Sequence, residues 1–270
     1  MNAETGREPS LAIRTLLQDG RPSRPMIDAF IAAHEFPLLE GDLATFVWRG
    51  SADALRLRHF IYALESDVPF LRVQGTDFWH CSLTLPRGSR IEYKIDVIRS
   101  GNHKWIRDPC NPRTAIDPFG ANSVCATEGY VVPDFVELDD ETRPGSIEEH
   151  WIEQTPFGER RRVDIYLPAR MRATRRYPLL IVHDGGDYLR FAALKEVLDN
   201  LIHRGEVQPL IVALTYPGDR LVEYPDDPRH TSFIAETLLP WLSARYTLLD
   251  DPDARVVMGA SFGGVAALSV

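Results

Sequence analysis

The sequence predicts two folded parts, an antiparallel β-sandwich followed by an α/β domain with a largely parallel sheet. In the first part, apolar residues recur with a period of two and turn residues separate the runs, as in a sandwich. In the second part, short and almost wholly apolar runs alternate with segments of helical periodicity, which is typical of strands covered by helices on both faces. We therefore expect an N-terminal helical segment over residues 1–42, a sandwich over 43–145 and an α/β domain over 146–270.

Composition and charge exclude several classes of protein. The 270 residues are 44% hydrophobic and 26% charged, which argues against disordered and fibrous proteins. No apolar run approaches the ~18 residues that span a bilayer, and the polar N-terminus lacks the apolar core of a signal peptide. Without such a run we expect no membrane partner, and because the net charge of −9 repels phosphate backbones we expect no nucleic-acid partner. Three cysteines without Cys-x-x-Cys spacing indicate a reducing compartment, no metal site and a cytoplasmic protein; they are Cys81, Cys110 and Cys125.

The first forty residues favour two short helices. Ser10 is placed to cap the first, and an apolar stripe that begins at Met26 predicts the second, which Pro37 ends. A stretch rich in Asp, Pro, Asn and Gly, residues 107–126, is expected to form an ordered loop packed on the sandwich. The predicted sandwich strands are 45–48, 55–58, 78–83 and 91–97.

The second part predicts a hairpin followed by alternating helices and strands. One helix should present its apolar face from Phe191 to Ile202 and end at Gly205, and a second should kink at Pro240. The predicted strands are 150–154 and 162–167 in the hairpin, then 179–183, 209–214 and 255–258.

The last predicted strand runs into Gly259-Ala260-Ser261-Phe262-Gly263-Gly264, and an apolar helical stretch follows. Strand, Gly-x-Ser-x-Gly and helix together are the setting of a nucleophile elbow. The glycines let strand and helix approach, so the Ser261 hydroxyl would stand beside a helix N-terminus, where the backbone N–H of Phe262 can stabilise an oxyanion. A tight strand–helix turn with an inert serine has the same glycines and is the alternative.

Other charged and polar residues admit two interpretations each. His183 could act as a base, but we favour a strand-end histidine that anchors the following loop. Arg220 and Glu223, in the loop after the fourth strand, are spaced to pair with each other, although Arg220 could also face an anionic substrate. The basic runs 160–162 and 170–176 are interpreted as solvated loop ends.

Four segments of the second part resemble the putative-esterase family of α/β-hydrolases, which includes enterochelin esterases, feruloyl and acetylxylan esterases, and S-formylglutathione hydrolase. The sandwich is similar to the immunoglobulin-like early-set domain of enterochelin esterases, and the order of the two domains points to that branch. The segments are His183–Tyr188, Arg220–Tyr224, Glu236–Pro240 with Tyr246, and Gly259–Gly264. The segments that carry the similarity of the sandwich are Phe46–Trp48, Asp77–Trp79, Leu85–Gly88, Tyr93–Lys94 and Asp108–Ser123.

The resemblance implies a serine carboxylic-ester hydrolase that forms an acyl-enzyme on Ser261 and uses no cofactor. The backbone N–H groups of Phe262 and Gly186 would form the oxyanion hole. Arg220, Asp187 and Tyr188 would contact the substrate, a small-molecule ester for which a ferric catecholate siderophore is one candidate.

The resemblance also implies an acid and a histidine after the nucleophile. All eight histidines precede Ser261, and residues 262–270 contain no Asp, Glu or His. We therefore expect the chain to be truncated after the elbow and a polypeptide of these 270 residues to be inactive by itself.

Two other functions stay open. One is a feruloyl or acetylxylan esterase, which we disfavour because enzymes acting on plant polymers usually need export. The other is a non-catalytic protein whose sandwich binds a glycan or another protein. In that case Trp48, Trp79 and Trp105 could stack on sugars, although buried tryptophan is the more common outcome.

Overall fold

The structure is a computed structural model that describes residues 11–61 and 64–270. The predicted cap at Ser10 lies outside the described residues. The chain divides into two compact units, Met1–Val132 and Pro133–Val270, each described here by itself. The predicted boundaries at 42/43 and 145/146 stay predictions.

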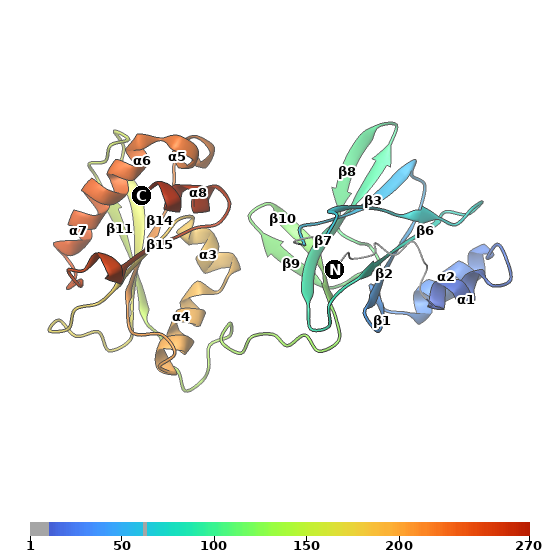
Figure 1. Ribbon diagram of the computed structural model, residues 1–270, viewed down its shortest axis with the longest axis horizontal. Coiled ribbons are helices and arrows are strands. Elements are labelled where there is room, and N and C mark those ends of the chain that lie inside the picture. Colours follow the sequence, from blue (N-terminus) through green and yellow to red (C-terminus); the bar gives the residue numbers. More distant parts are fainter. Residues whose placement is uncertain (1–10, 62–63) are drawn as a thin grey trace. The chain divides into compact units, whose positions relative to one another are not determined.

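The first unit is a sandwich of two antiparallel sheets (Figure 1). All four strands predicted for the sandwich, 45–48, 55–58, 78–83 and 91–97, are confirmed. The first sheet has the order β1 (Leu38–Glu40), β2 (Leu43–Arg49), β6 (Phe78–Thr84), β5 (Leu71–Arg72). The second has the order β4 (Asp67–Pro69), β3 (Ala54–His59), β7 (Arg90–Arg99), β10 (Gly120–Ala126), β9 (Thr114–Asp117), and β8 (Asn102–Ile106) also pairs with β7.

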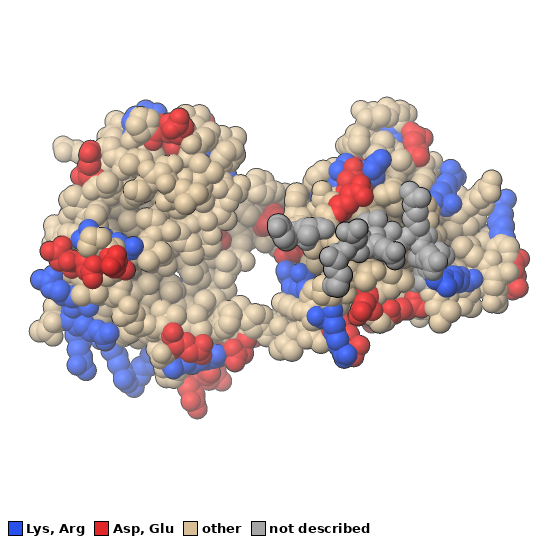
Figure 2. Space-filling view, viewed as in Figure 1, with Lys and Arg blue, Asp and Glu red and all other residues tan. Residues whose placement is uncertain are grey.

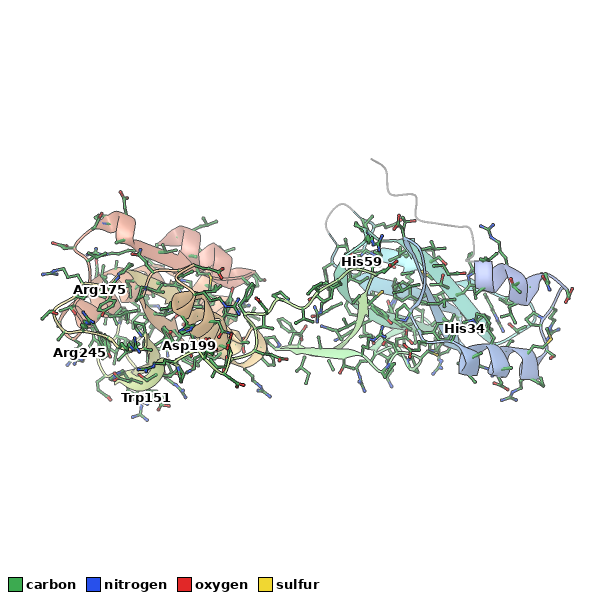
Figure 3. All side chains as sticks on the ribbon, turned by 90° about the horizontal axis from the view of Figure 1, so that it is seen from below. His34, His59, Trp151, Arg175, Asp199 and Arg245 are labelled. Atoms are coloured by element: carbon green, nitrogen blue, oxygen red, sulfur yellow. The ribbon has the colours of Figure 1, made fainter. Side chains whose placement is uncertain are left out.

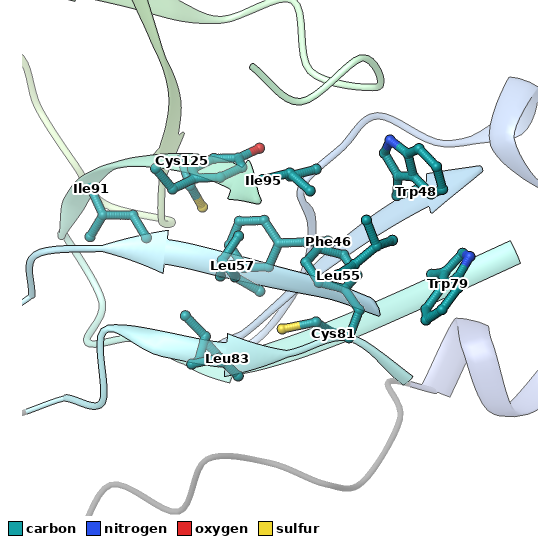
Figure 4. Packing of buried hydrophobic residues seen from close by; sticks show 14 of the residues in the cluster. Phe46, Trp48, Leu55, Leu57, Trp79, Cys81, Leu83, Ile91, Ile95 and Cys125 are labelled. Atoms are coloured by element: carbon teal, nitrogen blue, oxygen red, sulfur yellow. The ribbon is translucent and has the colours of Figure 1, made fainter. Parts of the chain in front are cut away.

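The core of the sandwich contains side chains from the facing sides of both sheets (Figure 4). Trp48 and Trp79 belong to this core and are each only 5% exposed, so the idea that they stack on sugars is wrong. Trp105 on β8 is 49% exposed. Helices α1 (Leu11–Leu17) and α2 (Arg24–Ala33) pack against the other side of the first sheet, which buries β2 on both faces.

The prediction of a loop over 107–126 is wrong in its second half, where β9 and β10 form a hairpin. Asp117 ends β9 and Pro118 lies in the turn between the two strands, so the residues of β10 keep the free N–H groups that pair with β7. The first half is an ordered loop, in which the buried Asp108 accepts a hydrogen bond from the Tyr93 hydroxyl at 2.7 Å.

The second unit is a five-stranded mixed sheet with helices on both faces, as the sequence predicts. The strand order is β11 (Ser146–Ile152), β12 (Arg161–Leu167), β14 (Ile211–Thr215), β13 (Leu179–Val182), β15 (Arg255–Met258). The first two pairings are antiparallel, and β13 pairs in parallel with both β14 and β15.

The helices of this unit differ from prediction in two details. The expected first helix is two, α3 (Gly185–Phe191) and α4 (Leu194–His203), because the chain breaks at Ala193 with φ +48°. These two cover one face of the sheet. The other face packs against a continuous helical segment. Where a kink at Pro240 was predicted, this segment instead has a π-helical stretch, Phe233–Leu238, just before Pro240. That segment is α6 (Pro228–Ser232), the π-helical stretch and α7 (Leu239–Ser243), preceded by α5 (Arg220–Asp226); α8 (Phe262–Ser269) ends the chain.

Candidate active site

Ser261 stands in the turn between β15 and α8, where the motif predicts it. Its backbone has φ +54° and ψ −124°, a left-handed conformation that non-glycine residues rarely adopt. Its carbonyl oxygen accepts the N–H groups of Gly264 at 3.0 Å and Val265 at 3.1 Å, which begins the helix. The side chain is exposed, and its hydroxyl makes no hydrogen bond within residues 11–61 and 64–270.

The glycines around Ser261 are required by contact. A Cβ atom on Gly259 would lie 2.2 Å from the carbonyl oxygen of Gly263, so a side chain there would push strand and helix apart. A Cβ atom on Gly263 would lie 2.9 Å from Oδ2 of Asp184. The elbow is therefore in direct contact with the loop that follows β13.

That loop turns sharply at Asp184, which has φ +54° and ψ +39°, and α3 begins at the next residue. Gly186 packs so closely that a Cβ atom would lie 2.6 Å from the ring of Tyr216. Among the described residues, the backbone N–H groups of Gly186 and Phe262 have no hydrogen-bond acceptor. Two free donors at two helix N-termini are what an oxyanion hole needs.

Arg220 links the elbow to this loop. Its Nε donates to both carboxylate oxygens of Asp184 at 3.0 Å, and its Nη2 reaches the carbonyl oxygen of Ala260 at 3.3 Å. Its guanidinium also lies 5.8 Å from the ring centroid of Phe262. Burial raises the pKa of the Asp184 carboxyl above its usual value, although the guanidinium opposes the rise.

The predicted pairing of Arg220 with Glu223 is wrong, as is their placement in a loop. Both lie in α5, where Arg220 points to Asp184 and Glu223 points to β12. Glu223 forms a buried ion pair with Arg161 at 2.5 Å, and the two side chains are 7% and 8% exposed. Arg161 is thus no solvated loop end, unlike the exposed residues of the run 170–176.

His183 lies in a buried aromatic cluster beneath the site. Its Nδ1 is 3.2 Å from the Thr215 hydroxyl, and its ring packs against Tyr224 and His230 with centroids 5.3 Å and 4.8 Å away. The Tyr224 hydroxyl in turn accepts the backbone N–H of Asp184 at 3.2 Å. Burial, with the neighbouring imidazole, lowers the pKa of His183 to about 4. The ring is fully buried, in agreement with an anchoring role.

Asp187 and Tyr188 lie in the first turns of α3 and are half-buried. Burial raises the pKa of the Tyr188 hydroxyl. Their contact with substrate stays a prediction.

Sequence reasoning missed three residues that hold the site together, namely Arg161, Asp184 and Tyr224. The signal for Asp184 was present, because an acid directly after a buried strand faces the carboxyl edge of the sheet. Partners for Arg161 and Tyr224 come from distant elements, and no local pattern marks them.

The described residues contain no group of three or more His, Cys, Asp or Glu side chains arranged to hold a metal ion. The three cysteines are unpaired, and burial raises the pKa of the Cys81 thiol to about 12. No helix in the described part of the chain has the length and apolar character to cross a bilayer.

Residues 155–270 match the family described as putative esterase. The fold is similar to that of the enterobactin esterase of Shigella flexneri, solved in the presence of enterobactin, with a TM-score of 0.65 and 22% identity over 89% of this chain and 71% of that one. It is also similar to the ferric enterobactin esterase of Salmonella typhimurium, with a TM-score of 0.63 and 22% identity over 85% and 68% of the two chains. These likenesses show an α/β-hydrolase-type fold.

A curated relative is the uncharacterized protein YjcH of Bacillus subtilis (strain 168), 23% identical over 131 residues. The match covers 46% of this chain and 55% of YjcH, so the matched region spans about half the length of that relative.

Proposed function

We propose that this protein, whose residues 155–270 match the putative esterase family, is a serine carboxylic-ester hydrolase with Ser261 as its nucleophile. The observation that carries the proposal is the backbone of Ser261, held at φ +54° and ψ −124° between a strand and a helix. Such a conformation costs on the order of 1–3 kcal/mol and accumulates at functional sites. Here it presents an exposed hydroxyl at the carboxyl end of the sheet.

In the proposed reaction, the Ser261 Oγ attacks the ester carbonyl and forms a tetrahedral intermediate. The oxyanion accepts the N–H groups of Phe262 and Gly186, each of which lacks another acceptor within the described residues. A donor of this kind contributes about 10²- to 10³-fold to turnover. A histidine takes the serine proton and gives it to the leaving alcohol, and water then hydrolyses the acyl-enzyme by the reverse proton path.

The proposed substrate contacts are Arg220, Asp187 and Tyr188. Arg220 is 29% exposed, and only its Nε and Nη2 are engaged among the described residues, so Nη1 is available for an anionic ester. Because the Shigella flexneri neighbour was solved in the presence of enterobactin, a ferric catecholate siderophore is the candidate that we propose to test first.

This mechanism requires a histidine and an acid that these 270 residues do not place after Ser261. His183 and His230, whose rings pack against each other, are both buried, and His183 bonds to Thr215. We therefore propose that a polypeptide of these 270 residues turns over esters poorly by itself.

The test is hydrolysis of p-nitrophenyl butyrate by the full-length gene product and by the 270-residue polypeptide. In the full-length protein, Ser261→Ala should lower turnover by about 10⁶-fold, the typical loss for a triad serine. Ser269→Ala, in the same helix, should leave both turnover and the circular dichroism spectrum unchanged. Activity of more than a few per cent in folded Ser261→Ala would exclude Ser261 as nucleophile.

The short polypeptide distinguishes the remaining alternatives. Robust turnover that depends on Ser261 would show that an upstream histidine is the base and would overturn the proposed order. A full-length protein that binds glycans but hydrolyses neither aryl esters nor a catecholate ester would instead support the non-catalytic alternative.

A further inference from the structure

A cavity lies at the opposite end of the parallel strands from Ser261. It has a volume of about 500 Å³ and lies wholly within the second unit. Its lining includes Tyr177 and Pro209, which stand just before β13 and β14 begin, whereas Ser261 follows the carboxyl end of β15. The cavity is therefore distinct from the candidate active site.

Four arginines line this cavity, and His203 from the last turn of α4 joins them. None of the four guanidinium groups has an ion pair or a hydrogen bond within the described residues. The arginines are Arg143, Arg170, Arg172 and Arg175, and we call the cavity that they line the arginine pocket.

The only acid in the lining, Asp199, does not neutralise these arginines. Its carboxylate already accepts the Tyr166 hydroxyl, the Gly145 N–H and the Lys195 ammonium, each at 2.7 Å. Because these donors occupy it and include a cation, Asp199 leaves the arginines without a counter-charge.

Several other arginines of the same unit have carboxylate partners. Arg161, Arg162 and Arg204 each pair with a carboxylate, while Arg160 and Arg245, like Arg175, lie over aromatic rings. Figure 2 shows Lys and Arg side chains gathered at the lower left of this unit. In a chain of net charge −9, a set of unpaired arginines around one cavity calls for an anion from outside the chain.

The segment that carries three of these arginines is held in place by its own contacts. The backbone N–H of Arg172 donates to the Tyr177 hydroxyl at 2.8 Å, and the N–H of Arg175 donates to the Arg172 carbonyl at 3.1 Å. The Arg175 guanidinium lies 5.4 Å from the centroid of the Tyr177 ring. The cations are thus presented by an anchored turn, which reduces the ordering cost of binding.

We propose that the arginine pocket binds a phosphorylated small molecule of about nucleotide size. Planar guanidinium groups match the oxygens of a phosphate in pairs, which is why several arginines favour phosphate over a single carboxylate. Ile202 and Pro209, which are partly exposed, supply apolar surface for the organic part of the ligand. The volume lies in the range of about 300–1,000 Å³ that is usual for small-molecule sites.

The test is isothermal titration of the full-length protein with ATP, pyrophosphate, adenosine and sulfate at about 0.15 M ionic strength. We expect ATP to bind with a Kd below about 1 mM, pyrophosphate to bind more weakly, and adenosine and sulfate to give no saturable heat. Equal binding of sulfate, or no binding of either phosphate compound, would overturn the proposal. Because Ser261→Ala should bind ATP as the wild type does, failure here is separate from failure of the esterase.

Matched variants locate the site. Arg172→Gln and Arg175→Gln should each weaken ATP binding at least about tenfold, since each removes a charge-assisted contact. Arg245→Gln and Arg160→Gln, which remove exposed arginines outside the cavity, should not change the Kd; Figure 3 labels Arg175, Arg245 and Asp199. Equal losses in both pairs would indicate only nonspecific attraction and refute the site.

Two further outcomes complete the test. Arg172→Lys keeps the charge but not the planar fork, so it should retain part of the affinity, and full retention would argue against paired contacts with phosphate. Tighter binding of double-stranded DNA than of ATP, growing with DNA length, would show a polyanion surface in place of the small-molecule site.

Discussion

Replacing Glu223 by alanine should destabilise the second unit strongly. Its carboxylate lies 2.5 Å from Arg161 Nη2, and it also accepts the N–H groups of Gly218 at 3.1 Å and Asp219 at 3.2 Å. Removing one partner of a buried pair costs about 3–5 kcal/mol, because the other charge stays buried without compensation. Glu159 also contacts Arg161 but is 64% exposed, so it compensates only part of that charge.

Two companion variants separate charge from hydrogen bonding. Glu223→Gln keeps one oxygen, which can still accept from Arg161 and Asp219, but it loses the charge and the acceptor for the Gly218 N–H, so its free energy of unfolding should fall by about 1–3 kcal/mol. The double variant Arg161→Met/Glu223→Leu removes both charges and should be less destabilised than Glu223→Ala alone.

The assay is urea unfolding combined with hydrogen exchange, so that the effect is assigned to the right unit. Protection should fall in β12 and β14 and stay unchanged in β2 and β6 of the sandwich. Arg204→Ala is the control, because its partner Asp134 is 78% exposed and such surface pairs contribute at most about 1 kcal/mol. If Glu223→Ala costs less than this control, the buried pair does not stabilise the unit and the reasoning fails.

Three further predictions concern the elbow, the buried histidines and the tryptophans. Gly259→Ala should destabilise the second unit by about 3 kcal/mol or more and abolish turnover of the full-length protein, because the new Cβ would lie 2.2 Å from a carbonyl oxygen of α8; normal unfolding and activity would contradict this. Burial lowers the pKa values of His183 and His230 from 6.5 to about 4. Between these pH values the unfolded chain binds more protons, so stability should fall as pH decreases, by up to roughly 1.4 kcal/mol per unit for each histidine. Urea unfolding between pH 4.5 and 7 should show a shallower dependence in His230→Phe, and an unchanged slope would refute it. Trp79→Ala should cost about 3–5 kcal/mol in the sandwich, whereas Trp105→Ala, at a 49% exposed side chain, should cost far less by thermal unfolding.

The strands and the elbow could be predicted because their signals are local. Buried strands such as 179–182 are apolar runs that can be recognised without knowing the rest of the chain. The elbow needs glycine two residues from its serine, because strand and helix approach closely in such a turn. The hairpin of β9 and β10 was missed for a complementary reason. β9 has only four residues and β10 begins with Gly-Ala-Asn-Ser, so neither shows a clear period of two, and the hairpin forms where β10 pairs with β7.

The partners of the arginines could not be predicted, because charge and spacing do not reveal which carboxylate the fold brings near. Arg161 and Arg175 both stand in basic runs beside β12. Arg161 forms an ion pair with Glu223, which lies 62 residues later in the chain, and both side chains are buried. Arg175 meets no carboxylate among the described residues and stays exposed. The same residue type therefore ends as a structural contact in one place and as a candidate ligand group in the other.

The glycines of the candidate site explain why its geometry depends on ion pairs from outside the motif. A glycine such as Gly259 allows the close approach of strand and helix, but without a side chain it contributes no packing that fixes the neighbouring loop. Arg220 supplies that constraint, since it holds Asp184 on the oxyanion side and the Ala260 carbonyl on the elbow side. Arg220 begins α5, and Glu223 attaches the same helix to β12. The two proposed oxyanion donors are thus positioned through a helix whose own anchor is a buried ion pair on an antiparallel strand, a dependence that the Gly-x-Ser-x-Gly motif alone does not contain.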